Sequence, residues 1–128
     1  MRDRAALGWG RYSWSKEKGA ALVHEDDLAA FIEIFPHGKL FQHVGNERQY
    51  LRLAYGPKLF RVKPDLFEPV PFTPMPVGTA VKIVERNLDA VIEELEWHWV
   101  RAKPYYILRY DGKRHTRWYW DEELSALG

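Results

Sequence analysis

The chain has 128 residues, a formal net charge of +1 and no cysteine. A chain of this length holds one domain or two very small ones, and it can bury roughly two thirds of the surface that it exposes when unfolded. Hydrophobic residues make up 46% of the sequence and aromatic residues 15%, which excludes a disordered chain. The lack of cysteine excludes disulfides and fits a reducing compartment. Because no apolar run approaches the roughly 18 residues of a membrane span, and no apolar signal core follows the N-terminus, we expect a cytoplasmic protein.

The first 35 residues predict an ordered arm and one short helix. Trp9, Tyr12 and Trp14 lie among three glycines within residues 1–20, a pattern too irregular for a helix and too aromatic for a free tail. We interpret this segment as an arm packed on the body of the protein. Residues 24–35 place apolar side chains at helical spacing after three acidic residues and end before a proline, which predicts the helix.

Short strand patterns follow the helix. They cover residues 39–44, 50–55 and 58–62 and are separated by turn signals at residues 45–46 and 56–57. A proline-rich stretch then begins after Pro64, where missing amide donors discourage both a helix and a central strand. We therefore place a domain boundary there. Residues 1–72 would contain the arm, the helix and a first β unit, and residues 73–128 a second β unit.

The second half also reads mainly as strands. Residues 80–84 fit a strand, and Asp111-Gly112 lies between two further strand patterns as a strong signal for a type I′ hairpin. Residues 121–124 fit a single helical turn. Residues 88–97 are ambiguous, because their apolar residues fit a helix stripe and also one face of a long strand, with Glu93 as the misfit.

A comparison of the chain with itself favours the strand. A shift of 56 positions places Tyr50 on Tyr106, Gly56 on Gly112 and Asp65 on Asp121, which keeps a hairpin, its turn glycine and a trailing acid in register. The two halves are therefore predicted to be an internal duplication.

Each half resembles a small SH3-like barrel, and residues 76–83, with a glycine just before an alternating strand, look like the opening strand of such a barrel. The resemblance implies a mainly β fold: two small SH3-like β-barrels in tandem, with an N-terminal arm and one short helix. The alternative is a single α+β domain.

Several motifs together resemble an uncharacterised family of bacterial proteins. They are Gly8-Trp9-Gly10 with Trp14, His24-Glu25-Asp26-Asp27-Leu28, Gly38-Lys39-Leu40-Phe41, Tyr105-Tyr106 and Arg117-Trp118-Tyr119-Trp120. The likeness covers nearly the whole chain. It implies no activity, so no residue inherits a role from it.

The six tryptophans fall in three close pairs. Two residues apart in a strand, indoles project from one face and could form a platform for a peptide, a base or a cation. Filling the core of a small barrel is the more common use of such rings. If one pair is exposed, we expect it at Trp97 and Trp99 beside His98. Our leading hypothesis is a non-enzymatic binding module for a protein or peptide, with Tyr55 and Tyr105 completing the surface.

A basic stretch from Arg101 to Arg117 offers an alternative function. Its cations lie beside Trp118 and would serve a weak nucleic-acid-binding protein. The candidate residues are Arg101, Lys103, Arg109, Lys113, Arg114 and Arg117. The acidic stretch at residues 85–96 supports a simpler account, in which neighbouring strands of opposite charge pair across a sheet.

Catalytic and metal-binding patterns are weak. The five histidines are scattered without i, i+2 or i, i+4 spacing, and no glycine-rich phosphate loop follows a strand. We therefore expect no cofactor, no metal and no enzymatic activity. An enzymatic reading would need folding to bring a histidine and a carboxylate together in a pocket, and His98 with Glu96 is the candidate pair.

Overall fold

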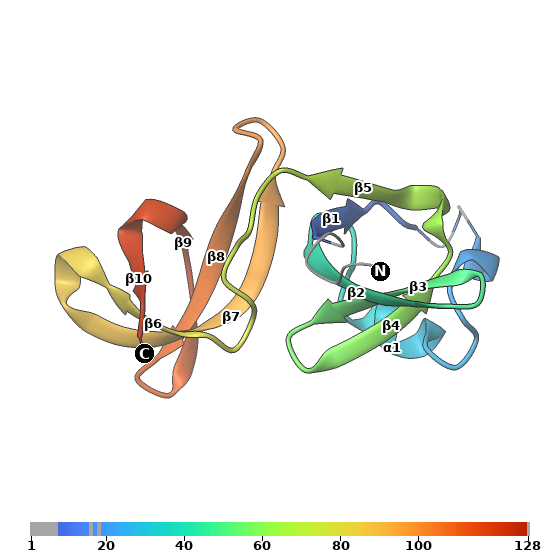
Figure 1. Ribbon diagram of the computed structural model, residues 1–128. Helices are drawn as coiled ribbons and strands as arrows, with labels where there is room; N and C mark the ends of the chain where they lie inside the picture. The colour runs from blue at the N-terminus through green and yellow to red at the C-terminus, as the bar shows by residue number, and fades with distance from the viewer. Residues whose placement is uncertain (1–7, 16, 18, 128) are drawn as a thin grey trace. The chain divides into compact units, whose positions relative to one another are not determined.

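The computed structural model describes residues 8–15, 17 and 19–127, and it divides into two compact units. Unit 1 ends at Thr73 and unit 2 begins at Pro74, one residue beyond the boundary expected from the prolines. The structure is mainly β, as the sequence indicates, with one five-stranded antiparallel sheet in each unit (Figure 1). Since the two sheets are separate and the α-helix found in the described residues is short, the alternative of a single α+β domain is wrong.

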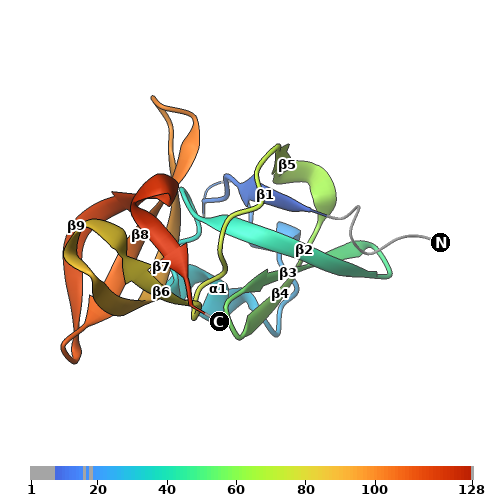
Figure 2. The same ribbon diagram turned by 60° about the vertical axis from the view of Figure 1, so that its left-hand side comes forward.

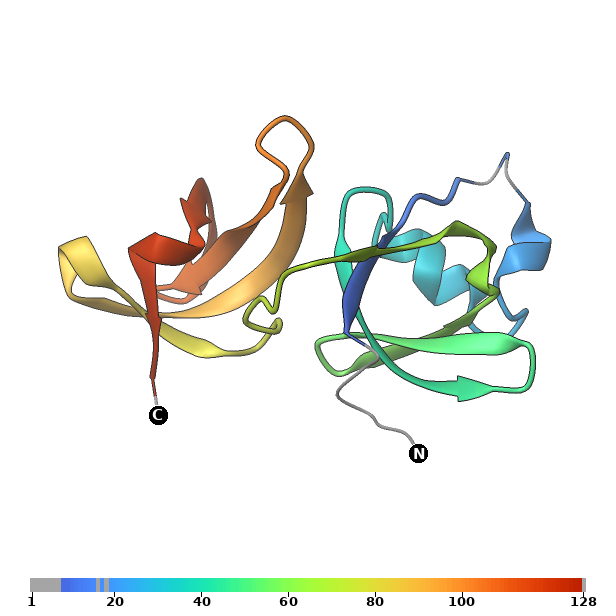
Figure 3. The ribbon, with the colours of Figure 1, turned by 45° about the horizontal axis from the view of Figure 1, so that its top comes forward.

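Unit 1 is built from one curved sheet and a helix. In Figures 2 and 3 its strands bend around α1 (Leu28–Glu33). The strand order is β4-β3-β2-β1-β5. The strands are β1 (Trp9–Tyr12), β2 (Leu40–Glu47), β3 (Tyr50–Tyr55), β4 (Lys58–Val62) and β5 (Phe67–Val70).

The N-terminal segment is part of this sheet rather than an arm packed on it. β1 pairs with β2 on one side and with β5 on the other. Gly10 permits this close approach, because a Cβ atom added there would lie 2.7 Å from the carbonyl oxygen of Glu68. Residues 1–7, 16 and 18 of the expected arm lie outside the described residues.

The helix is shorter than residues 24–35, and its main role is to fill the core of unit 1. Phe31 is fully buried. Its ring lies 5.1 to 5.9 Å from four other aromatic rings, those of Tyr12, Trp14, Phe41 and Phe60. Beyond the helix end, Phe35 adopts a positive φ of 52°, a conformation that normally favours glycine.

One predicted turn of unit 1 is wrong. The signal at Gly45-Asn46 lies inside β2, where a change of register between His43 and Gly45 lets the strand continue. The chain reverses two residues later, and Arg48 takes the positive φ of 57° that this turn requires.

Unit 2 repeats the strand order of unit 1. Its order, β10-β6-β7-β8-β9, again places the fifth strand beside the first and the fourth at the far edge. A 3-10 turn precedes the fifth strand in both units, at Pro64–Leu66 and at Asp121–Glu123. The strands are β6 (Ala80–Ile83), β7 (Leu88–His98), β8 (Lys103–Tyr110), β9 (Lys113–Trp120) and β10 (Leu124–Ala126).

β7 resolves the ambiguous segment in favour of a strand. The register with β8 changes between Ile92 and Glu94, so Glu93 is the extra residue of an irregularity. This explains why it did not fit the alternation. At the β8–β9 hairpin, Asp111 and Gly112 have φ values of 53° and 75°, which confirms the predicted turn.

The core of unit 2 is also rich in aromatic rings. Trp97, Tyr106 and Tyr119 are buried on the inner face of the sheet. The Tyr106 hydroxyl donates a hydrogen bond to Asp121 Oδ1 at 2.8 Å and accepts one from the Met75 N–H at 3.1 Å. Burial raises the pKa of this phenol. Within the described part of the chain, no helix is long and apolar enough to cross a membrane.

Candidate functional site

An aromatic cluster covers the outer face of three neighbouring strands in unit 2. His98 on β7, Tyr105 on β8, and Trp118 and Trp120 on β9 form what we name the aromatic face. The Tyr105 ring stacks on Trp118, with centroids 4.4 Å apart and planes inclined by 26°. The His98 ring meets the other three edge-on at 5.4 to 6.0 Å. The four rings therefore pack against one another and form a continuous aromatic surface.

Strand alternation explains why these rings face outward. On β9 the buried Tyr119 lies between Trp118 and Trp120, and consecutive side chains of a strand point to opposite faces. Tyr105 stands directly opposite Trp120 across the β8–β9 pair. Trp118 remains 49% exposed despite its stack on Tyr105.

The turn between β7 and β8 borders the aromatic face. The His98 ring accepts a hydrogen bond at Nδ1 from the Arg101 N–H at 3.1 Å, and the Ala102 N–H donates to the His98 carbonyl at 2.8 Å. These bonds hold a turn that exposes Trp99 (48%) and Val100 (90%). The exposed apolar surface therefore extends beyond the strands.

Two cations lie on the Trp120 ring. The Lys103 Nζ is 4.4 Å from the ring centroid and the Arg101 guanidinium carbon is 5.7 Å from it. A positive charge over an indole face is attracted by the ring quadrupole. This end of the aromatic face is consequently both apolar and positively charged.

The middle of the aromatic face has a negative neighbour. Partial burial raises the pKa of Tyr105, and the charges of Glu96 and Glu94 raise it further. Glu96 is the residue opposite Tyr105 on β7. The phenol therefore stays neutral at neutral pH and contributes an uncharged ring to the aromatic face.

The basic stretch is largely neutralised by the acidic one. Arg109 binds Glu93 at 2.9 Å, and Arg114 binds Glu94 at 2.8 Å, which confirms the expected pairing between oppositely charged strands. The hydrogen bond from Arg109 holds the pKa of Glu93 below its usual range. Both pairs lie on the same unit as the aromatic face, toward the β8–β9 hairpin.

Two more cations have carboxylate partners at the other end of unit 2. Lys103 binds Glu122 at 3.2 Å and Arg117 binds Glu123 at 3.4 Å. Among the residues that the structure describes, four of the six cations from Arg101 to Arg117 therefore have a carboxylate partner. Lys113 is exposed at the hairpin.

Some of the site residues expected from the sequence lie elsewhere. Tyr55 is buried in unit 1, with its ring 5.6 Å from that of Phe41. Trp97 is only 8% exposed, so the expected exposed pair of Trp97 and Trp99 is wrong. The reason is that β7 ends at His98, and residues two apart project from the same face only within a strand.

On β9, Trp118 is exposed and Trp120 on the same face is partly buried, and the sequence reasoning left both out of the candidate surface. The signal was present, because the two indoles stand two residues apart in a strand that follows the Asp111-Gly112 turn. The missing information was that β9 is an edge strand, where one face is more easily left uncovered.

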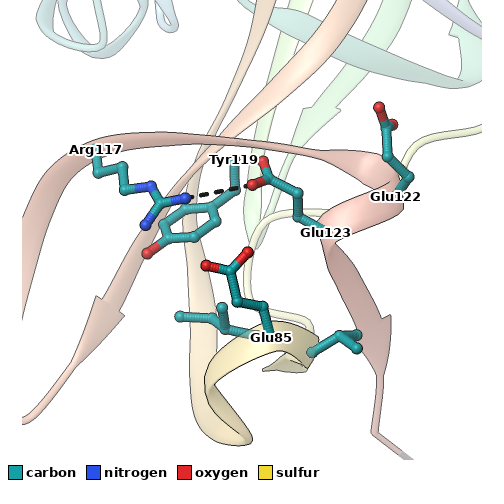
Figure 4. A pocket seen from close by; sticks show the side chains of 7 residues that line it. Glu85, Arg117, Tyr119, Glu122 and Glu123 are labelled. Atoms are coloured by element: carbon teal, nitrogen blue, oxygen red, sulfur yellow. Dashed lines mark hydrogen bonds and ion pairs between the residues drawn. The ribbon is translucent and has the colours of Figure 1, made fainter.

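A hollow of about 190 Å³ lies on another side of unit 2 (Figure 4). In this view Arg117 lies over the Tyr119 ring, 4.6 Å from its centroid, and reaches Glu123, while Glu122 points away. The hollow is lined by Ile83, Val84, Glu85, Arg117, Tyr119, Glu122 and Glu123. It contains neither His98 nor Glu96, so it does not bring the candidate catalytic pair together.

The comparisons with known proteins give a family and no assigned function. Neither the curated proteins nor the solved structures contain a match. A family model described as a family of unknown function, DUF6960, matches residues 1–125. The sequence resemblance to an uncharacterised family agrees with this result. The chain therefore belongs to the family of unknown function DUF6960.

Proposed function

We propose that this protein is a non-enzymatic binding module that holds a segment of a partner protein on the aromatic face of unit 2. The observation that carries the proposal is the half-exposed Trp118, stacked on Tyr105 and flanked by His98 and Trp120. Three large rings and an imidazole are held at the surface in fixed mutual geometry. A partner segment would therefore meet a surface that is already organised.

The energetics of exposed rings support a binding role. Each 100 Å² of apolar surface removed from water contributes roughly 2.5 kcal/mol, so covering these rings supplies a favourable contribution against the entropic cost of association. Tryptophan, tyrosine and arginine are the residues most enriched among those that dominate protein interfaces. Trp118, Tyr105 and Arg101 supply all three within one region.

The charge distribution favours a protein segment over a nucleic acid. Nucleic-acid affinity depends on cations that are free to replace counterions along the phosphate backbone. Here Arg109, Arg114 and Arg117 already bind carboxylates. Stacking of apolar side chains or prolines on the rings needs no such cations.

We also propose that each unit is an SH3-like barrel and that the protein acts in the cytoplasm. Support for the first comes from the shared strand order and from the 3-10 turn before the fifth strand of each unit. A chain without cysteine accords with a reducing compartment.

Selection from a displayed library of random 12-residue peptides against the full chain tests the binding role. We expect peptides rich in proline and aliphatic residues, with affinities measured by calorimetry. Trp118→Ala and Tyr105→Ala should each weaken binding by about thirtyfold or more, since residues that dominate an interface typically cost at least about 2 kcal/mol when truncated.

Leu59→Ala is the control, because Leu59 is a large apolar residue with nearly the same exposed fraction (50%) but lies on β4 of unit 1. It should weaken binding by less than about threefold. The proposal fails if selected peptides bind the Trp118→Ala variant as tightly as the natural chain. It also fails if single-stranded oligonucleotides bind in a salt-dependent manner and no peptide does.

A further inference from the structure

The cations around the aromatic face are not equivalent. Lys103 lies on Trp120 and binds Glu122, so its charge is compensated within the unit. Arg101 lies on the same ring, but among the residues that the structure describes no carboxylate binds it. One uncompensated guanidinium therefore stands at the turn end of the aromatic face.

The turn holds the backbone of Arg101, and its side chain lies on the Trp120 ring. Its backbone N–H donates to His98 Nδ1, and His98 is itself packed against Trp118 and Trp120. The guanidinium lies over an indole face, which leaves its N–H edge available to an oxygen ligand. An arginine held in this way loses less side-chain freedom when it binds a carboxylate.

The other charged residues make the two ends of the aromatic face differ in charge. At the hairpin end Arg109 and Arg114 are matched by Glu93 and Glu94. In the middle, the charge of Glu96 contributes to the raised pKa of Tyr105 and would repel a second carboxylate. Of the two cations that lie on the rings, Arg101 is therefore the one better placed to meet a negative ligand group.

We propose that the bound segment carries an aspartate or glutamate that pairs with Arg101, while its apolar residues lie on Tyr105 and Trp118. This inference rests on the proposed function of the aromatic face and adds the chemistry and orientation of the partner. The carboxylate accepts hydrogen bonds from the guanidinium, and the segment runs from the turn toward the hairpin.

The test uses the full chain and three pools of 12-residue peptides with amidated C-termini. Proline, leucine, phenylalanine and serine occupy eleven positions at random, and the remaining position, moved along the peptide, is Glu, Gln or Lys. Because a partly exposed pair contributes modestly and is screened by salt, the Glu pool should bind the natural chain about fivefold more tightly than the Gln pool at low salt.

Two substitutions make the prediction specific. Arg101→Gln should bring the Glu and Gln pools to equal affinity, and Arg101→Glu should make the Lys pool the best of the three. Lys113→Gln is the matched control, since Lys113 is an exposed cation of the same unit at the hairpin, and it should leave the order of the pools unchanged.

Three outcomes overturn the inference. If the pools bind equally while Trp118→Ala still abolishes binding, the carboxylate is wrong and the proposed function stands. If Lys113→Gln acts like Arg101→Gln, the effect is general charge attraction and Arg101 has no special place. If no pool binds in a manner that depends on Trp118, the proposed function fails and this inference fails with it.

Discussion

The two units share one strand order but place their aromatic rings differently. In unit 1 the connection between the first two strands contains α1, and Phe31 on that helix packs among rings in the core. In unit 2 the same connection is a 3-10 turn at Val84–Arg86, and the rings of Trp118 and Tyr105 lie on the outer face. Both units therefore have an aromatic core, and unit 2 in addition carries aromatic rings on the outer face of its sheet.

A pair of arginines shows the same contrast. Arg61 in β4 and Arg117 in β9 are 56 residues apart, the spacing of the internal repeat. The Arg61 guanidinium donates two hydrogen bonds to Asp27, at 2.9 and 3.1 Å, and the Arg61 backbone N–H donates a third at 2.8 Å, which ties β4 to the segment before α1. Arg117 has no such helix to hold, and it covers the Tyr119 ring instead. The arginine at this repeated position therefore joins two elements in unit 1, whereas in unit 2 it covers an aromatic ring.

The largest expected effect is on the core of unit 1. Phe31→Ala should lower its free energy of unfolding by about 3–5 kcal/mol, because a fully buried ring is lost and a cavity remains. Amide hydrogen exchange of the full chain should show lost protection in β1 to β4 and unchanged protection in β6 to β10. Equal loss in both units would show that the two units unfold together rather than separately.

Replacing a buried tryptophan of unit 2 should lower the free energy of unfolding far more than replacing an exposed one. Trp97→Ala is expected to cost about 3–5 kcal/mol in denaturant unfolding, whereas Trp118→Ala should cost less than about 1 kcal/mol. An equal loss of unfolding free energy in the two variants would mean that Trp118 is a core residue and that the aromatic face is not an exposed surface.

The ion pair of unit 1 predicts a pH-dependent effect of intermediate size. Hydrogen bonds from Arg61 hold the pKa of Asp27 below its usual range, so the unfolded chain binds that proton more readily than the folded chain. The resulting stability is present above the ordinary pKa of about 3.9 and is lost as the pH falls through the lower folded value. Asp27→Asn should lower the melting temperature by about 5 °C at pH 7.

The difference between the natural chain and this variant should then shrink below about pH 4. Glu25→Gln is the control, because Glu25 is an exposed acid of the same segment. A difference that stays constant from pH 7 to pH 3 would show that the carboxylate charge of Asp27 does not stabilise unit 1.

The smallest expected effect is a gain in stability at the end of α1. Phe35 is 77% exposed and has a positive φ. Phe35→Gly should therefore raise the free energy of unfolding by about 1 kcal/mol, because glycine adopts this conformation without steric cost. Ala102→Gly in unit 2, at a φ of 52°, should act in the same direction. Destabilisation by either change would mean that the side chain makes a contact worth more than the strain.

The sequence predicted the strands better than the surfaces. Alternation and the Asp111-Gly112 turn were enough for β8 and β9, since both depend on local geometry. The sequence did not predict the register change at Glu93 or the strand at Trp9–Tyr12. Each depends on pairing with residues that are distant in the chain.

The candidate site could be predicted only in part. His98 and Tyr105 were expected at the surface and belong to the aromatic face. Trp97 and Tyr55 were expected there and are buried. Alternation identifies residues that share a face, but it does not say which face the rest of the unit covers.

The most direct test of the central claim is nuclear magnetic resonance of the six indole N–H groups in the full chain, titrated with peptides selected as above. The account predicts that the Trp118 and Trp120 signals shift strongly, while those of the buried Trp9, Trp14 and Trp97 stay in place. Shifts at Trp9 and Trp14 in unit 1 with none at Trp118 would contradict it.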